Sequence, residues 1–383
     1  MNDKKQVVPQ RTVLILQGGG ALGAFQGGVF EALDGSGLAP DWVIGTSIGA
    51  INAAIIAGNR PARRLEKLYE FWARIGQEGW SGGGDEQPAV TTFALGTAWQ
   101  AWCVATMGLP NFFVPRWWQG FALGLRVPPQ LAGHYDTTPL RRTLEELVDF
   151  DYLNDGPTRI AVGAVDVESG AIRYFDSARD RICVEHILAS SALPPAFPAI
   201  EIDGHYYWDG GLHSNTPLEW MLRDEPRRHT LCFLATLWPC EDSAPTTLLD
   251  VMRRSKELQY ASRADTLLAL EQEAHRLRHG ISVLAGHLPA ELRQQPVLDE
   301  IIRQGCRSTY HVIRLQAPRL VHDTHAKDID FATSSIQRRW DSGRHDALVA
   351  LAAKPWERPV GAEEGVVLHA AGTETTAAMR SDA

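Results

Sequence analysis

The sequence has few cysteines, no excess of positive charge and no long apolar run near its start. Its five cysteines are far apart and form no C-x-x-C pair: Cys103, Cys183, Cys232, Cys240 and Cys306. This spacing fits neither a disulfide framework nor a zinc site, so we expect a reducing compartment. The apolar run before the first glycines, 13–16, has only four residues, whereas the apolar core of a secretory signal needs about 7–15. We therefore predict a cytoplasmic protein without a signal peptide.

Positive charge is scarce because 37 Lys and Arg residues stand against 46 Asp and Glu residues, which gives a net charge of −9. A nucleic-acid-binding protein is expected to be basic overall or to carry a basic stripe. Only short basic clusters occur, such as that in residues 60–67, so we expect no nucleic-acid partner. Hydrophobic residues make up 44% and charged residues 22% of the 383-residue chain, which is typical of a globular protein.

The first 60 residues alternate between strand and helix patterns. Residues 12–16 and 42–44 are short apolar runs that each end in glycine, as buried strands entering turns do. A helical pattern follows each run, over residues 23–34 and from Ile48 to a stop at Gly58. This order is typical of a parallel sheet covered by helices, and we predict the α/β fold class.

A candidate nucleophile lies in the turn between the second strand and its helix. Gly45-Thr46-Ser47-Ile48-Gly49 is a G-x-S-x-G run. A serine on such a turn has a strained backbone, so the residues two before and two after it must be small. Its hydroxyl lies at a helix N-terminus, where the helix dipole favours developing negative charge. The alternative is a glycine-rich turn that contains an incidental serine.

A second glycine-rich segment, Gly18-Gly19-Gly20-Ala21-Leu22-Gly23, follows the first strand. Successive backbone N–H groups in such a turn can bind a phosphate or the oxyanion of an acyl-transfer intermediate. The spacing also matches the dinucleotide-binding fingerprint, with Asp41 as its acidic residue. We favour the oxyanion site because Asp41 precedes the second strand, whereas the ribose-binding acid should follow it.

A serine nucleophile needs a base, and Asp209 in Asp209-Gly210-Gly211 is the best candidate. It follows the aromatic segment 206–208, where partial desolvation would raise its basicity. Asp-Gly-Gly alone is an ordinary turn, so the argument depends on the combination of motifs. A Ser-His-Asp triad stays open, since this part of the chain contains histidines, among them His134, His186, His205 and His213.

Taken together, these motifs resemble those of the patatin-like phospholipases, which are similar in their first half to the catalytic domain of cytosolic phospholipase A. The resemblance covers about residues 10–240 and includes the intermediate segments 136–140, 189–194 and 215–218. It implies a three-layer fold with a central, mainly parallel sheet. It also implies hydrolysis of lipid carboxylic esters by a Ser-Asp dyad through an acyl-enzyme, without histidine, metal or organic cofactor.

The family motifs assign a role to each matching residue of this chain. By resemblance, Ser47 is the nucleophile and Asp209 is the base. The remaining motif residues are the oxyanion-hole glycines Gly18, Gly19 and Gly20 and the supporting glycines Gly23, Gly45, Gly49, Gly210 and Gly211. We expect a lipid or another hydrophobic ester as the substrate.

The domain prediction follows from the extent of the resemblance. It comprises a flexible N-terminus (1–10), a catalytic domain (11–245), an aromatic-rich insertion or cap within it (81–133), a helical C-terminal extension like that of some bacterial members (246–354) and a disordered tail (355–383). In the extension, helical patterns cover 246–287 and roughly 290–315.

The stretch 89–109 is uncharged and about long enough to span a bilayer. A single pass there would separate Ser47 from Asp209, which must meet for the mechanism to work. We therefore predict either a buried or cap helix, or a helix that dips into the membrane interface with its tryptophans at head-group level. The latter would make 81–133 a peripheral membrane contact.

Three alternatives to a lipid-ester hydrolase stay open from the sequence. A nicotinamide or flavin oxidoreductase would use the Gly18–Gly23 segment for pyrophosphate. A catalytically idle lipid-binding protein would keep the fold without turnover. A hydrolase of another ester, a polyester or a thioester would use the same residues. The oligomeric state is also open.

Overall fold

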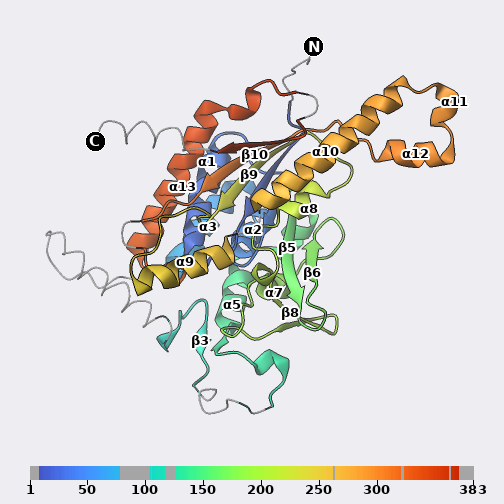
Figure 1. Cartoon of the computed structure of the whole chain (residues 1–383). Helices are drawn as coiled ribbons and strands as arrows, with labels where there is room; N and C mark the ends of the chain where they lie inside the picture. Colours follow the sequence, from blue (N-terminus) through green and yellow to red (C-terminus); the bar gives the residue numbers. More distant parts are fainter. Residues whose placement is uncertain are drawn as a thin grey trace, which may run out of the picture.

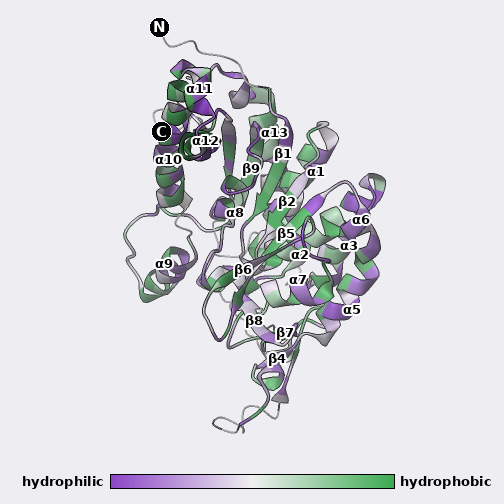
Figure 2. Ribbon diagram, turned by 90° about the vertical axis from the view of Figure 1, so that its right-hand side faces the viewer, coloured by the Kyte–Doolittle hydropathy of each residue, from purple (hydrophilic) through white to green (hydrophobic). Residues whose placement is uncertain are grey.

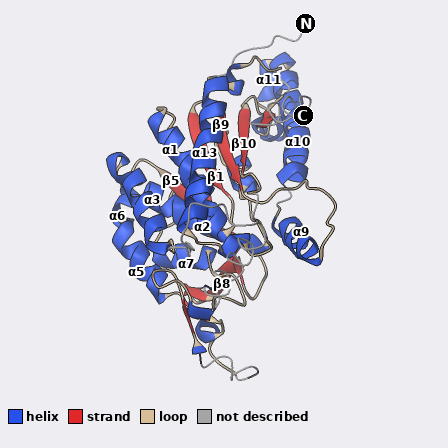
Figure 3. Cartoon of the chain, turned by 90° about the vertical axis from the view of Figure 1, so that its left-hand side faces the viewer, coloured by secondary structure: helices blue, strands red, loops and turns tan. Residues whose placement is uncertain are grey.

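The computed structural model of the chain describes residues 8–77, 104, 106–117, 124, 126–261, 264–320, 323–361 and 364–370. Within these residues one large sheet runs through the centre of the molecule, and helices cover both of its faces (Figures 1 and 3). The α/β prediction is thereby confirmed, and the sheet is mainly parallel as expected.

The large sheet has nine strands among the described residues, in the order β11-β10-β9-β1-β2-β5-β8-β7, with β6 paired to β5. Their bounds are β1 Arg11–Leu16, β2 Trp42–Gly45, β5 Arg159–Asp166, β6 Ile172–Asp176, β7 Ile200–Ile202, β8 His205–Asp209, β9 Thr230–Thr236, β10 Tyr310–Gln316 and β11 Val366–Ala370. The pairings from β11 through to β5 are parallel. The pairings of β5 with β6 and β8, and of β8 with β7, are antiparallel. Two short strands, β3 Val114–Pro115 and β4 Tyr135–Asp136, form a separate pair.

The helices form the two outer layers. Their bounds are α1 Ala24–Gly35, α2 Ile48–Ala57, α3 Pro61–Ile75, α5 Thr138–Leu147, α6 Phe150–Asp155, α7 Val184–Ser190, α8 Leu218–Leu222, α9 Leu248–Tyr260, α10 Ala264–His287, α11 Ala290–Arg293, α12 Pro296–Arg303 and α13 Thr333–Ala353. Alternate residues of β1 point to opposite faces, as a strand requires. Leu14 and Leu16 join the larger buried cluster with α1, α2 and α13, and Val13 and Ile15 join a smaller cluster with α8.

The C-terminal part of the chain belongs to the sheet, which corrects two predictions. The helical stretch predicted over roughly 290–315 ends earlier than predicted, because Tyr310–Gln316 is strand β10, paired with β9. The tail predicted to be disordered contains β11, paired in parallel with β10 over Val366–Ala370. Both segments are short runs with β-branched residues. Their backbone partners, the edge of β9 for β10 and the edge of β10 for β11, are not revealed by a local pattern.

Helix α13 packs along α1, so the two ends of the fold lie side by side (Figure 1). Glycines allow this close approach. A Cβ on Gly28 would lie 1.9 Å from the carbonyl oxygen of Trp340, and one on Gly343 would lie 2.0 Å from that of Phe25. The C-terminal extension is therefore built onto the first helix of the chain.

Most of the predicted cap at 81–133 lies outside the described residues, and so does most of the 89–109 stretch. Of the latter, only residues 104 and 106–109 are described. Among the helices that the structure describes, none is both long enough and apolar enough to cross a membrane.

Candidate active site

Ser47 lies between β2 and α2 in a backbone conformation that is rare for a residue with a side chain. Its φ is 57° and its ψ is −124°. The flanking glycines permit the turn, since a Cβ on Gly45 would lie 2.2 Å from the carbonyl oxygen of Gly49. A Cβ on Gly49 would lie 2.2 Å from that of Leu16. Such strain is typical of functional turns, and here it holds a partly exposed serine at the N-terminus of a helix.

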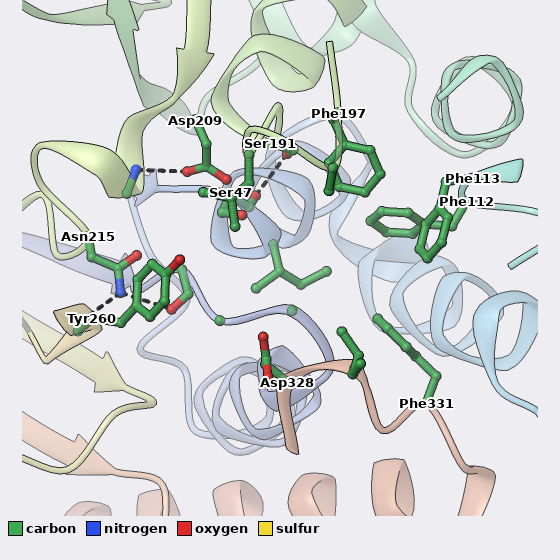
Figure 4. Close-up of a pocket in the computed structure, with 18 of the residues that line it drawn as sticks. Ser47, Phe112, Phe113, Ser191, Phe197, Asp209, Asn215, Tyr260, Asp328 and Phe331 are labelled. Atoms are coloured by element: carbon green, nitrogen blue, oxygen red, sulfur yellow. Dashed lines mark hydrogen bonds between the residues drawn. The ribbon is translucent and has the colours of Figure 1, made fainter. Parts of the chain in front are cut away.

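The Ser47 turn is also held from α7. The Ser47 N–H donates to the carbonyl oxygen of Ser190 at 3.1 Å. The Ser191 hydroxyl donates to the carbonyl oxygen of Ser47 at 3.2 Å. These bonds use the backbone of Ser47 and leave its hydroxyl facing the cavity (Figure 4).

Asp209 ends strand β8 and lies beside Ser47 (Figure 4). Only 2% of the residue is exposed, and its carboxylate accepts the Gly211 N–H at 2.7 Å. Burial raises the pKa of Asp209 to about 7, although hydrogen bonds with the Ser47 side chain and the Gly211 N–H act in the opposite direction. A Cβ on Gly210 would lie 2.3 Å from the carbonyl oxygen of Gly163, so the close turn after Asp209 requires glycine.

The loop Gly18–Gly20 borders the same cavity as Ser47 and Asp209. The Gly18 N–H is taken, because it donates to the carbonyl oxygen of Asn215 at 3.1 Å. The Gly19 and Gly20 N–H groups have no acceptor among the described residues. Gly20 has a φ of +56°, and a Cβ there would lie 2.2 Å from the carbonyl oxygen of Asp328. Gly23 packs against Ile48 at the start of α2, where a Cβ would lie 2.6 Å from that side chain.

Two residues that the sequence analysis did not assign hold the glycine loop in place. The Asn215 amide donates to the carbonyl oxygens of Gly18 at 3.1 Å and of Tyr260 at 3.0 Å. The Trp238 indole N–H also donates to the Gly18 oxygen, at 2.8 Å. The Asn-Thr-Pro-Leu segment at 215–218 was the available signal for Asn215, whereas nothing local marks Trp238.

The cavity has a volume of about 270 Å³ and two unlike ends (Figure 4). Ser47, Asp209 and Asn215 lie at the polar end. The opposite end is lined by aromatic side chains from three parts of the chain: Phe112, Phe113, Phe197 and Phe331. The C-terminal part of the chain also contributes Tyr260, Asp328 and Ile329, so this cavity is not confined to the predicted catalytic domain of 11–245.

The four candidate histidines lie elsewhere, since no histidine is among the described residues that line the cavity. His186 accepts the Cys183 N–H at 2.9 Å, and His205 pairs with Asp166 at 3.2 Å. Asp41, the acidic residue of the dinucleotide-binding alternative, lies beside the start of β2, where its carboxylate accepts the Thr12 N–H at 2.7 Å. These positions favour Asp209 as the partner of Ser47.

Comparison with known proteins gives the family. A family model for patatin-like phospholipases matches residues 14–222, which is more than half of the chain. The chain belongs to the patatin-like phospholipase family. A second model, described as patatin phospholipase, matches residues 258–363. The predicted family is thereby confirmed.

The individual relatives match this member of the family either over a short segment or at low sequence identity. Patatin-like phospholipase domain-containing protein 6 of mouse and of human is 43% identical over 61 residues. That match covers 16% of this chain and only 4% of the relative's length. VipD from Legionella pneumophila has 15% identity and a TM-score of 0.41, over 90% of this chain and 67% of VipD. The type III effector ExoU has 11% identity and a TM-score of 0.34, over 91% of this chain and 54% of ExoU.

Proposed function

We propose that this chain hydrolyses carboxylic esters of lipids with Ser47 as nucleophile and Asp209 as general base. The observation that carries the proposal is a serine on a strained turn beside a buried carboxylate with a pKa of about 7, in one cavity. A general base acts best when its pKa is close to the working pH. An ordinary aspartate, with a pKa near 4, would be a much weaker base.

In the first step, the Ser47 hydroxyl attacks the ester carbonyl and its proton passes to Asp209. The tetrahedral intermediate carries a negative oxygen, and the unpaired N–H groups of Gly19 and Gly20 are the donors we assign to it. Gly18 has a positioning role in this proposal, because its N–H already donates to Asn215. Asp209 then returns the proton to the departing alcohol, which leaves Ser47 acylated.

In the second step, water attacks the acyl-enzyme. Asp209 takes a proton from the water, the oxyanion again receives the glycine N–H groups, and Ser47 leaves with the proton held by Asp209. The fatty acid is released and the dyad returns to its starting state. Removal of one oxyanion donor typically costs about 2.7–4 kcal/mol of transition-state stabilisation, so the glycine loop contributes on the same scale as a catalytic side chain.

The aromatic end of the cavity supports the proposal that the hydrophobic acyl chain of the substrate binds there. Four phenylalanines line that end (Figure 4). Apolar burial is non-directional, so it selects a hydrocarbon chain without reading its functional groups. The proposal also keeps a peripheral membrane contact through 81–133, where the described Met107 and Trp117 are exposed to solvent.

The test is covalent labelling of the intact protein with a fluorophosphonate probe, followed by hydrolysis of a short-chain chromogenic ester. We expect Ser47→Ala to lose both labelling and turnover. Ser191→Ala is the matched control, because Ser191 lines the same cavity and should still leave Ser47 labelled. Labelling that persists in Ser47→Ala, or that is lost only in Ser191→Ala, would refute the assignment of the nucleophile.

A further inference from the structure

Helix α9, Leu248–Tyr260, buries two charged side chains and exposes five apolar ones. Arg253 and Glu257 are almost fully buried, at 3% and 0% exposure. Five apolar side chains are between 47% and 75% exposed: Leu248, Leu249, Val251, Met252 and Leu258. A surface helix of a globular protein normally does the reverse, with its apolar stripe against the core. Figures 2 and 3 show α9 at the periphery, outside the main layers of the fold.

An ion-pair network on the buried side fixes this orientation. Arg253 pairs with Asp242 at 2.6 Å and with Glu257 at 2.8 Å. Glu257 also pairs with Lys327 at 2.7 Å, and the Lys327 side chain is 3% exposed. Buried charges need such partners. Rotation of α9 to cover its leucines would separate these charges, so the apolar residues stay outside.

The exposed apolar residues lie on one side of the helix, where the exposed Ser255 and Gln259 lie among them. At 100° per residue, Leu248, Val251, Met252 and Leu258 fall within about half of the helix circumference, with Leu249 at its edge. The face ends close to the candidate active site, because Tyr260, two residues after Leu258, lines the cavity. Lys256 on the same helix pairs with Asp328, another cavity residue, at 2.6 Å.

We infer that this apolar face of α9 docks on a lipid surface and holds the cavity against it. The inference rests on the proposed function. A lipid ester is part of a membrane or another lipid phase, so the cavity must lie next to that phase to receive it. A lipid surface also suits the edge of the face, where the partly exposed Lys256 can keep its ammonium group at head-group level. The chain's net charge of −9 favours docking by apolar insertion over attraction to anionic lipid.

The test measures binding of the full chain to phosphatidylcholine vesicles by co-sedimentation, in a Ser47→Ala background that removes the proposed turnover. The variant carries Leu248→Ser, Leu249→Ser, Met252→Ser and Leu258→Ser together. The matched control carries Leu270→Ser, Leu277→Ser and Leu284→Ser on α10, three leucines that are 60–68% exposed. We expect at least a tenfold loss of vesicle binding for the α9 variant, little change for the control, and binding that persists at high salt.

A second measurement separates this inference from the proposed function. With Ser47 intact, the α9 variant should hydrolyse a soluble short-chain ester as the wild type does, and an ester embedded in vesicles at least tenfold more slowly. Equal vesicle binding by wild type and α9 variant would overturn the docking inference while leaving Ser47 as nucleophile. The docking inference would also be overturned if the wild type were a dimer that does not bind vesicles and the α9 variant were a monomer. In that case a second copy of the chain would cover the face.

Discussion

The replacement of Asp209 by asparagine should abolish activity and stabilise the protein at the same time. Asparagine keeps the size of the side chain and an oxygen that can accept the Gly211 N–H, but it can neither ionise nor take the Ser47 proton. We therefore expect turnover to fall by a factor of at least about 100, as loss of a general base typically does. The fold should be retained because, among the described residues, no cation contacts the buried carboxylate.

The gain in stability follows from the pKa of Asp209. Burial raises it from 3.8 to about 7, and one unit of pKa corresponds to about 1.4 kcal/mol, so ionisation of Asp209 in the folded chain costs up to about 4 kcal/mol. Between these two values the folded chain keeps the proton and the unfolded chain has lost it. The wild-type free energy of unfolding therefore falls as pH rises through this window. The advantage of asparagine should be absent near pH 4 and complete above about pH 8.

The assay is urea unfolding of wild type and Asp209→Asn at several pH values, together with kcat/KM on a soluble ester. Wild-type kcat/KM should rise with pH through about 7, because only the ionised carboxylate accepts a proton. Asp155→Asn, at an exposed position, is the control and should change neither quantity. Wild-type turnover in Asp209→Asn would refute the assignment of the base. Equal stability of the two proteins at pH 8 would refute the argument from burial.

Two further predictions concern how the C-terminal part is joined to the fold. Gly28→Ala should destabilise the protein by about 1–3 kcal/mol, since its Cβ would lie 1.9 Å from the Trp340 oxygen. Gly35→Ala in the same helix meets nothing within 4 Å and should be neutral or stabilising in the same thermal melt. A chain that ends at residue 363 lacks β11 and should melt at a lower temperature than one that ends at Ala370, because the edge of β10 loses its partner. Equal melting temperatures in either comparison would contradict the packing described.

The sequence predicted those parts of the fold and candidate site that depend on local backbone geometry. The glycines around Ser47 are recognisable because the turn excludes any Cβ, and the contact between Gly45 and Gly49 lies within five residues. The same holds for the alternation of strand and helix in the first 60 residues. The pairing of Ser47 with Asp209 was expected from the family resemblance, and its assignment as a catalytic dyad stays a prediction.

Features that depend on distant partners were missed. Which side of α9 is buried could not be predicted, since the burial of Glu257 depends on its bond with Lys327, 70 residues further along the chain. Strand β10 was taken for the end of a helix because a seven-residue run does not reveal that β9 has a free edge. Trp238 was not assigned because its bond to Gly18 spans 220 positions.

The contact between Gly20 and Asp328 has a consequence for biosynthesis. The serine turn and the glycine loop leave the ribosome early, but the segment that packs on the loop and lines the cavity is translated about 280 residues later. At typical elongation rates of about 5–20 residues per second, that interval lasts many seconds. The cavity is completed only when residues 328–331 have been made. A nascent or prematurely terminated chain thus carries Ser47 without a finished cavity around it.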